Sequence, residues 1–295
     1  MQRRNTLIRR LPATEASRKK LLILLFSVMM TLDAYAAAQS REQVIKIVAQ
    51  IQQADYKGDR AALKRLCEEL APSVENKDIA SQARYWRGFA LWRRAINGFN
   101  DKVDPRELQE DLTQAVAEFN KAIEKNPGFV DAKIGSLSCL GFLAFSMRQQ
   151  DPGNARIPEL IAETRALWKS TQTDAPDNPR LLWVIGPMIW NTPTERGGGQ
   201  AKAIEGYQKG LATIRGHKTT VSDPLEPSWG EPELLMSLAW SNLNGTTTDL
   251  DAAERDARSA LELVPYWHYV RDITYASNSR RPEKTALENP NFSPP

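Results

Sequence analysis

Apolar residues recur three and four positions apart along most of the chain, which is the spacing of one face of an α-helix. The first such stretch after residue 38 runs from Arg41 to Tyr56, and its apolar positions are Val44, Ile47, Val48, Ile51 and Ala54. The next runs from Arg60 to Leu70 and carries Leu63, Cys67 and Leu70. No stretch alternates apolar and polar residues for long enough to indicate a strand. The pattern therefore predicts an all-α protein.

Short breaks rich in proline, glycine, asparagine and aspartate divide this pattern into pairs of helices. We expect such pairs within residues 41–70, 81–126, 131–171, 180–214 and 233–263. The composition of Asn97–Glu107 predicts an enlarged loop inside the second pair of helices. The composition of Gly216–Pro232 predicts a long irregular connection. Trp229 lies between two prolines there and is expected to pin the connection onto the helices. Each pair is too small to bury its own apolar face, so the pairs must stack.

One spacing of small and aromatic residues occurs twice. In the stretch Asp111–Leu140 it places Ala115, Phe119 and Ala122 on one helical face, followed by Pro127. Small residues on that face let a partner helix approach closely, and the proline ends the helix because it cannot donate the next hydrogen bond. The spacing returns near the end of the chain, with alanine in place of the aromatic residue, at Ala253, Ala257, Ala260 and Pro265.

These positions resemble the second helix of a tetratricopeptide (TPR) repeat, whose signature ends A-x3-F-x2-A-x4-P. The segments around Gly88, in YWRGFALW, and around Gly186 are similar to the first helix of the same repeat. At the second of these, the positions that match W-x2-L-G-x2-Y are Leu182, Ile185, Gly186 and Ile189. The resemblance implies a right-handed superhelix of about five TPR-like helix-turn-helix repeats over residues 39–275, with a concave inner face.

The resemblance also implies which side chains line the groove of that superhelix. The predicted groove residues lie at the groove-facing positions of two first helices, except Arg93, which lies beside them. They are Gln82, Tyr85, Phe89, Trp92, Arg93, Arg180, Trp183 and Trp190. Aromatic groups with a few arginines are typical of surfaces that bind peptides or other ligands. The alternative is that these rings pack against neighbouring repeats. The Lys/Asn pattern of TPR domains that clamp a C-terminal carboxylate is missing.

The first 38 residues have the features of a secretory signal. A segment with seven lysines and arginines precedes the apolar run LLILLFSVMMTL and an A-x-A site at residues 34–36 or 36–38. The run is well short of the roughly 20 residues that span a bilayer. We expect a periplasmic or secreted protein with no stable membrane span after cleavage, and the alternative is an uncleaved N-terminal anchor. Residues 276–295 are expected to form a polar, proline-rich tail without a fold of its own.

The charge of the chain changes when the signal is removed. The whole sequence has 39 basic and 36 acidic residues, whereas residues 39–295 have 32 and 34, a net charge of −2. This balance argues against nucleic-acid binding, which needs a clustered positive face. The two cysteines, Cys67 and Cys139, lie at apolar helical positions. They could be packing residues or, in an exported protein, could form a disulfide.

Patterns that indicate catalysis are absent from the sequence. The two histidines, His217 and His268, lie in no metal-binding or triad spacing, and no common catalytic motif occurs. Gly197–Gly199 precede a helix and could bind an anion with their amides, or could form only a flexible loop. We therefore predict no catalytic residue, metal or cofactor. The sequence favours a non-enzymatic scaffold that binds a protein or peptide. The alternative, based on Trp183, Trp190 and the glycines, is a periplasmic solute-binding or transport-accessory protein.

Overall fold

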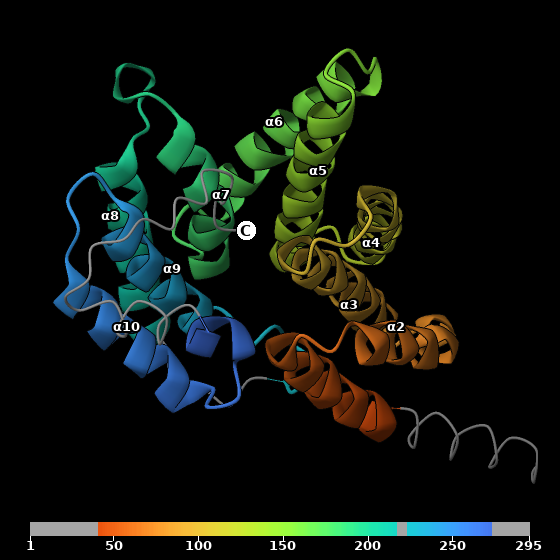
Figure 1. The fold of residues 1–295 in the computed structure, drawn as a ribbon. Coiled ribbons are helices and arrows are strands. Elements are labelled where there is room, and N and C mark those ends of the chain that lie inside the picture. The colour runs from red at the N-terminus through yellow and green to blue at the C-terminus, as the bar shows by residue number, and fades with distance from the viewer. Residues whose placement is uncertain (1–40, 217–222, 273–295) are drawn as a thin grey trace, which may run out of the picture. The chain divides into compact units, whose positions relative to one another are not determined.

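The computed structural model describes residues 41–216 and 223–272, and these residues form helices joined by short connections (Figure 1). They contain no strand, so the all-α prediction is confirmed. A first helix ends at residue 57, and the α-helices that follow are α2 (Arg60–Glu69), α3 (Ala80–Asn100), α4 (Pro105–Lys125), α5 (Val130–Gln150), α6 (Arg156–Asp174), α7 (Pro179–Asn191), α8 (Gln200–Gly216), α9 (Glu231–Asn244) and α10 (Leu250–Leu263). The predicted signal (1–38), His217 and the predicted tail (276–295) lie outside the described residues.

Most helices that follow one another in the sequence pack against each other. The pairs α3/α4, α5/α6, α7/α8 and α9/α10 are each in contact, and α4 also packs on α5 (Figure 1). The apolar positions of the first helix and of α2, including Val44, Ile51 and Leu63, join the same buried cluster as α3 and α4. Two short 3-10 helices, Ala71–Glu75 and Thr194–Arg196, lie in the connections.

The loop predicted between α3 and α4 is much shorter than expected. Residues 97–107 were predicted to be an enlarged loop, but α3 continues to Asn100 and α4 begins at Pro105. Asn97 is buried within α3, and its side chain donates to Asp55 on the first helix at 3.1 Å. The new helix starts where the Asp104 side chain accepts a hydrogen bond from the Arg106 amide, ahead of a proline at its first position.

The small and aromatic residues of the repeated spacing have a direct packing role. The Phe119 ring lies between glycines of two other helices, Gly88 on α3 and Gly135 on α5. A methyl group at Gly135 would lie 2.4 Å from the ring, and one at Gly88 would lie 2.9 Å from it. The pair α7/α8 repeats the arrangement, since a methyl group at Gly186 would lie 2.1 Å from Tyr207. Glycine at these positions therefore lets the paired helices approach closely.

We expect Gly135→Ala to destabilise the fold by about 1–3 kcal/mol, because the added methyl group overlaps a ring that is fully buried and cannot move aside. Gly141→Ala is the matched control on the same helix, since no atom lies within 4 Å of its added methyl group. There, replacing glycine should raise stability by about 0.5–1 kcal/mol. Urea unfolding of both variants measures the difference, and equal effects would show that the Phe119 contact is not tight.

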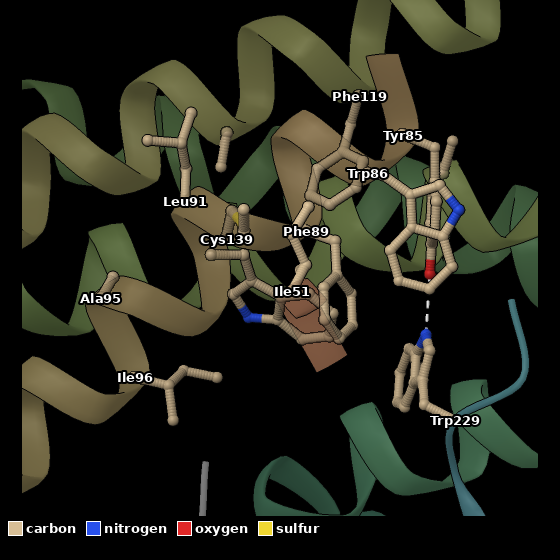
Figure 2. Close-up of a cluster of buried hydrophobic side chains, with 14 of the residues drawn as sticks. Ile51, Tyr85, Trp86, Phe89, Leu91, Ala95, Ile96, Phe119, Cys139 and Trp229 are labelled. Atoms are coloured by element: carbon tan, nitrogen blue, oxygen red, sulfur yellow. Dashed lines mark hydrogen bonds between the residues drawn. The ribbon is translucent and has the colours of Figure 1, made fainter. Parts of the chain in front are cut away.

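Helix α5 is long and apolar enough to cross a membrane by length and composition. In the structure most of the segment that passes this test is buried, and α5 packs on α3, α4, α6 and α7. Its Cys139 is fully buried among apolar side chains (Figure 2), as is Cys67 on α2, and both thiols are free. Burial raises the pKa of Cys67 to about 11 and also raises that of Cys139. Of the two interpretations, the structure shows packing.

Candidate functional site

The side chains predicted to line a groove lie mostly in the interior. Five of the eight are buried, with at most 4% of their surface exposed: Tyr85, Phe89, Trp92, Arg93 and Trp183. Gln82, Arg180 and Trp190 are partly exposed, and Trp190 packs edge-to-face on Trp240. The sequence analysis gave a second possibility, that these rings pack against neighbouring parts of the fold. That possibility holds for the five buried residues.

Their main partner is a segment of the same chain, residues 223–230, which we call the insert segment. The Trp229 ring lies with its centroid 5.6–5.8 Å from those of Phe89, Trp92 and Trp183. Its indole nitrogen donates a hydrogen bond of 2.7 Å to the Tyr85 hydroxyl, as Figure 2 shows. The expectation that Trp229 pins this connection is therefore confirmed. A partner protein could reach these rings only by displacing the insert segment.

Polar contacts hold the backbone of the insert segment. The Trp86 indole donates to the carbonyl of Leu225 at 2.8 Å, and Arg180 donates to the carbonyl of Trp229 at 3.2 Å. Arg180 is itself held by Asp131, whose carboxylate accepts two hydrogen bonds from the guanidinium. The predicted groove residues thus contact an irregular segment that contains a turn, and that segment belongs to this chain.

A buried group of charges lies beside the aromatic cluster. Arg93 donates to Asp55 at 2.7 Å, and one of its nitrogens lies 3.9 Å from Glu233. The Glu233 carboxylate also accepts from the Tyr56 hydroxyl at 2.8 Å and from the Gly230 amide at 2.9 Å. Burial raises the pKa of Glu233, the charge of Arg93 lowers it, and that of Asp55 raises it. This group joins the first helix, α3 and α9.

An exposed apolar site lies elsewhere, where the end of α3 meets α4 and α5. We call it the α3–α5 hollow, a shallow depression lined by apolar side chains. Phe99 packs edge-to-face on Phe142 and on Phe145, with centroids 6.4 and 6.0 Å apart, and Phe145 is 39% exposed. The full lining is Ala95, Ile96, Phe99, Leu108, Leu112, Phe142, Phe145 and Ser146.

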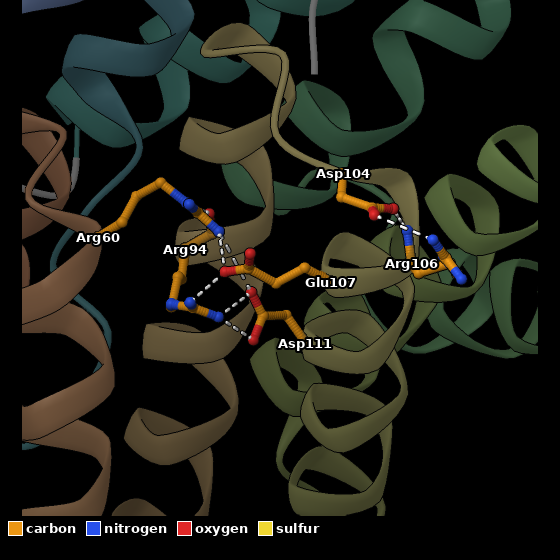
Figure 3. A network of polar contacts seen from close by, with 6 residues as sticks. All are labelled: Arg60, Arg94, Asp104, Arg106, Glu107 and Asp111. Carbon is orange, nitrogen blue, oxygen red and sulfur yellow. Dashed lines mark hydrogen bonds and ion pairs between the residues drawn. The ribbon is translucent and has the colours of Figure 1, made fainter.

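Ion pairs fix the helices that form this hollow. Arg60 and Arg94 converge on Glu107 and Asp111 at the start of α4, as Figure 3 shows. The hydrogen bond from Arg60 lowers the pKa of Glu107. On the other side, Gln109 of α4 donates to Ser146 of α5 at 3.1 Å. Because both sides of α4 are tied to a neighbour, the lining of the hollow is held in place before any ligand binds.

Two exposed cations follow aromatic residues of the hollow in the sequence. Arg148 is exposed and follows Phe145 by three positions on α5, and Lys102 is exposed and follows Phe99 by three positions at the end of α3. Lys102 has a left-handed backbone, with φ of 56°. The amide of Lys102 bonds to the carbonyl of Phe99, and the amide of Val103 bonds to that of Gly98. In this helix-ending motif glycine is usual, and a residue with a side chain costs on the order of 1 kcal/mol.

The remaining candidates from the sequence have structural partners. The amides of Gly197, Gly198 and Gly199 each donate to a backbone carbonyl of Thr194, Pro193 or Ile189. A ring nitrogen of His268 lies 3.2 Å from the carbonyl of Tyr56. Within residues 41–216 and 223–272, no group of three or more histidine, cysteine, aspartate or glutamate side chains could hold a metal ion.

Comparison with known proteins finds a similar fold among solved structures but no related sequence. No protein-family model matches the chain, and no curated protein matches its sequence. Among solved structures, the chain is similar to the HusA haemophore from Porphyromonas gingivalis, with a TM-score of 0.51 and 19% sequence identity. The match covers 70% of this chain and 94% of that one. At this identity the likeness shows a shared helical fold.

Proposed function

We propose that this protein is an exported, non-enzymatic binding protein whose ligand is a planar apolar molecule of the haem class. The observation that carries the proposal is the aromatic lining of the α3–α5 hollow, where Phe145 is exposed and Phe99 and Phe142 are partly exposed, while the predicted groove is filled by the insert segment. The shared fold with a haemophore supports the same ligand class. The expected signal at residues 1–38 supports export to the periplasm or beyond.

The chemistry of the hollow fits a flat apolar ligand. Removing apolar surface from water is worth roughly 25 cal/mol per Å², and aromatic rings add favourable offset or edge-to-face contacts. Phe99, Phe142 and Phe145 supply such rings from two helices. The lining contains no histidine, cysteine, methionine or tyrosine, so its contribution is apolar contact rather than a bond to a metal.

Titration with haemin tests the proposal. We expect a saturable change in the Soret absorbance with a stoichiometry of one, and a rise in melting temperature with haemin concentration, because a ligand of the folded state stabilises it. A linear, unsaturable change in absorbance without any rise in melting temperature would refute the function.

Protein or peptide binding is a second candidate, and a different surface favours it. Helix α10 and the residues after it expose three large apolar side chains, Leu250, Leu263 and Tyr266, at 38–44%. The resemblance to TPR repeats supports a superhelical scaffold of stacked repeats. In such a scaffold the exposed side chains of α10 would lie on the last repeat. Crosslinked capture from the extracytoplasmic fraction, with Leu263→Ser as control, tests it. A partner captured equally by both proteins would place the contact away from α10.

A further inference from the structure

We infer that α3 and α7 form a peptide-recognition site, which the chain's own Leu225 and Trp229 occupy. The partner that fits this site is a protein segment with a leucine and a tryptophan four residues apart, and it binds by displacing the insert segment. None of the residues that stack on Trp229 or bond to it lines the α3–α5 hollow. This site is therefore separate from the one proposed for haem and can be tested without haemin.

Two buried anchors hold the insert segment, and the residues between them face solvent. Leu225 is fully buried and Trp229 is 3% exposed. Between them, Glu226 and Pro227 are partly exposed and Ser228 is exposed. A bound peptide contacts a groove in this way, because a few buried side chains, tryptophan above all, supply most of the binding energy. The same pattern defines the partner by its leucine and its tryptophan.

Side chains of the helices bind the backbone of the insert segment. Among the described residues, one backbone hydrogen bond joins two members of the segment, and it closes a turn. The carbonyls of Leu225 and Trp229 accept instead from Trp86 of α3 and Arg180 of α7. Main-chain hydrogen bonds give a bound peptide affinity, and anchor side chains give it specificity. Any peptide backbone that follows the same path can accept these two bonds.

The binding surface is held by contacts that do not involve the insert segment. Arg180 is fixed by two hydrogen bonds to Asp131 of α5. The Trp183 indole donates to Ser237 of α9 at 3.1 Å, and the rings of Trp92 and Trp183 lie 6.1 Å apart. A surface that is ordered by its own helices loses little conformational freedom on binding, which favours an exchange of one peptide for another.

The fit of the insert segment is imperfect at Glu226. Gln82 donates to its carboxylate at 3.5 Å, the outer limit of a hydrogen bond. Burial raises the pKa of Glu226, the bond from Gln82 lowers it, and the carboxylates of Asp223 and Asp131 raise it further. The charged form of Glu226 therefore weakens the fit of the segment at neutral pH. A partner peptide with an uncharged residue at this position avoids that cost.

The test supplies the insert segment as a separate molecule. A labelled peptide of residues 223–231, DPLEPSWGE, is titrated into the Trp229→Ala protein and followed by fluorescence anisotropy. We expect saturable binding with a stoichiometry of one and a rise in melting temperature, because a ligand of the folded state stabilises it. A peptide that carries Trp229→Ala should bind at least about thirtyfold more weakly, the loss expected for an anchor. A peptide that carries Glu226→Gln should bind about twofold to fivefold more tightly at pH 7.

The wild type is the control for competition within the chain. Its own Trp229 is tethered at an effective concentration of roughly millimolar, so it should bind the peptide at least about tenfold more weakly than Trp229→Ala does. Equal binding to both proteins would place the peptide elsewhere and overturn the inference. A folded Trp229→Ala protein that shows no saturable binding would mean that the insert segment is only internal packing. If Trp229→Ala does not fold, Trp229→Phe replaces it, and the same two results overturn the inference there.

The peptide that carries Glu226→Gln tests the exchange itself. Tighter binding than the native peptide at pH 7 supports displacement of the insert segment by a better-fitting partner. Weaker binding would show that the Glu226 carboxylate is a favourable contact, and a partner would then have no advantage over the segment already in place.

Discussion

Trp229→Ala is expected to destabilise the protein by about 3–5 kcal/mol, because it empties a large volume at the centre of the aromatic cluster. Trp229 is 3% exposed and packs on Phe89, Trp92 and Trp183. Its removal also leaves the Tyr85 hydroxyl buried without its donor. In a protein of this size the loss lowers the melting temperature by about 6–20 °C. Thermal unfolding followed by circular dichroism measures it.

Two further variants divide this effect into its parts. Trp229→Phe keeps an aromatic ring but loses the hydrogen bond to Tyr85 and part of the buried indole, so we expect an intermediate cost of about 1–3 kcal/mol. Ser228→Ala is the neighbouring control, since Ser228 is exposed and bonds only to the side chain of Gln52. It should change stability by less than about 0.5 kcal/mol. A cost below about 1 kcal/mol for Trp229→Ala would mean that the insert segment is loosely held and that the predicted groove is open to a partner.

The helix pairs could be predicted because their signals are local. Gly88, Phe119 and Gly186 form contacts between adjacent helices, so the spacing within one helix pair is enough to identify them. The exposure of the groove residues was not predictable in this way. Tyr85 and Trp229 are 144 residues apart, and no periodicity specifies that a distant segment returns to cover a helix face.

The same reason explains what sequence reasoning missed at the α3–α5 hollow. The composition of NGFND predicts a turn at Phe99, whereas the structure places Phe99 in α3, where its ring meets Phe142 and Phe145. The latter two, three positions apart and followed by Arg148, were the available signal. Asp55 and Glu233 were likewise missed, since each has a partner only across the fold.

Arg93→Met is expected to cost about 3–5 kcal/mol at pH 7, because it removes the cation between two buried carboxylates while nearly conserving volume. Arg93 and Glu233 are 4% and 0% exposed, and Asp55 is 2% exposed. The guanidinium carbon also lies 5.5–5.9 Å from the rings of Phe89, Trp92 and Trp183, so cation–π contacts are lost as well. The control is Arg65→Met, whose ion pair with Glu69 is exposed and worth less than about 0.5 kcal/mol.

The pH dependence of this variant has a definite sign. The pKa of Glu233 is raised above 4.5 in the folded state, chiefly by burial, so the folded protein binds this proton more tightly than the unfolded chain does. Its contribution to stability is therefore largest below about pH 4.5 and is lost as the pH rises through the raised pKa. Because Arg93 lowers that pKa, its removal raises it further and extends the loss toward neutral pH.

Urea unfolding of Arg93→Met at pH 5 and pH 7.5 should accordingly show a smaller deficit, relative to wild type, at the lower pH. Adding Glu233→Gln to Arg93→Met should reduce the deficit at pH 7.5 and flatten its pH dependence. The glutamine oxygen can still accept from the Gly230 amide, and its NH2 group can donate to the Tyr56 hydroxyl, without carrying a charge. If the deficit is the same at both pH values, and the glutamine does not reduce it, then Arg93 stabilises the fold through its ring contacts rather than through Glu233.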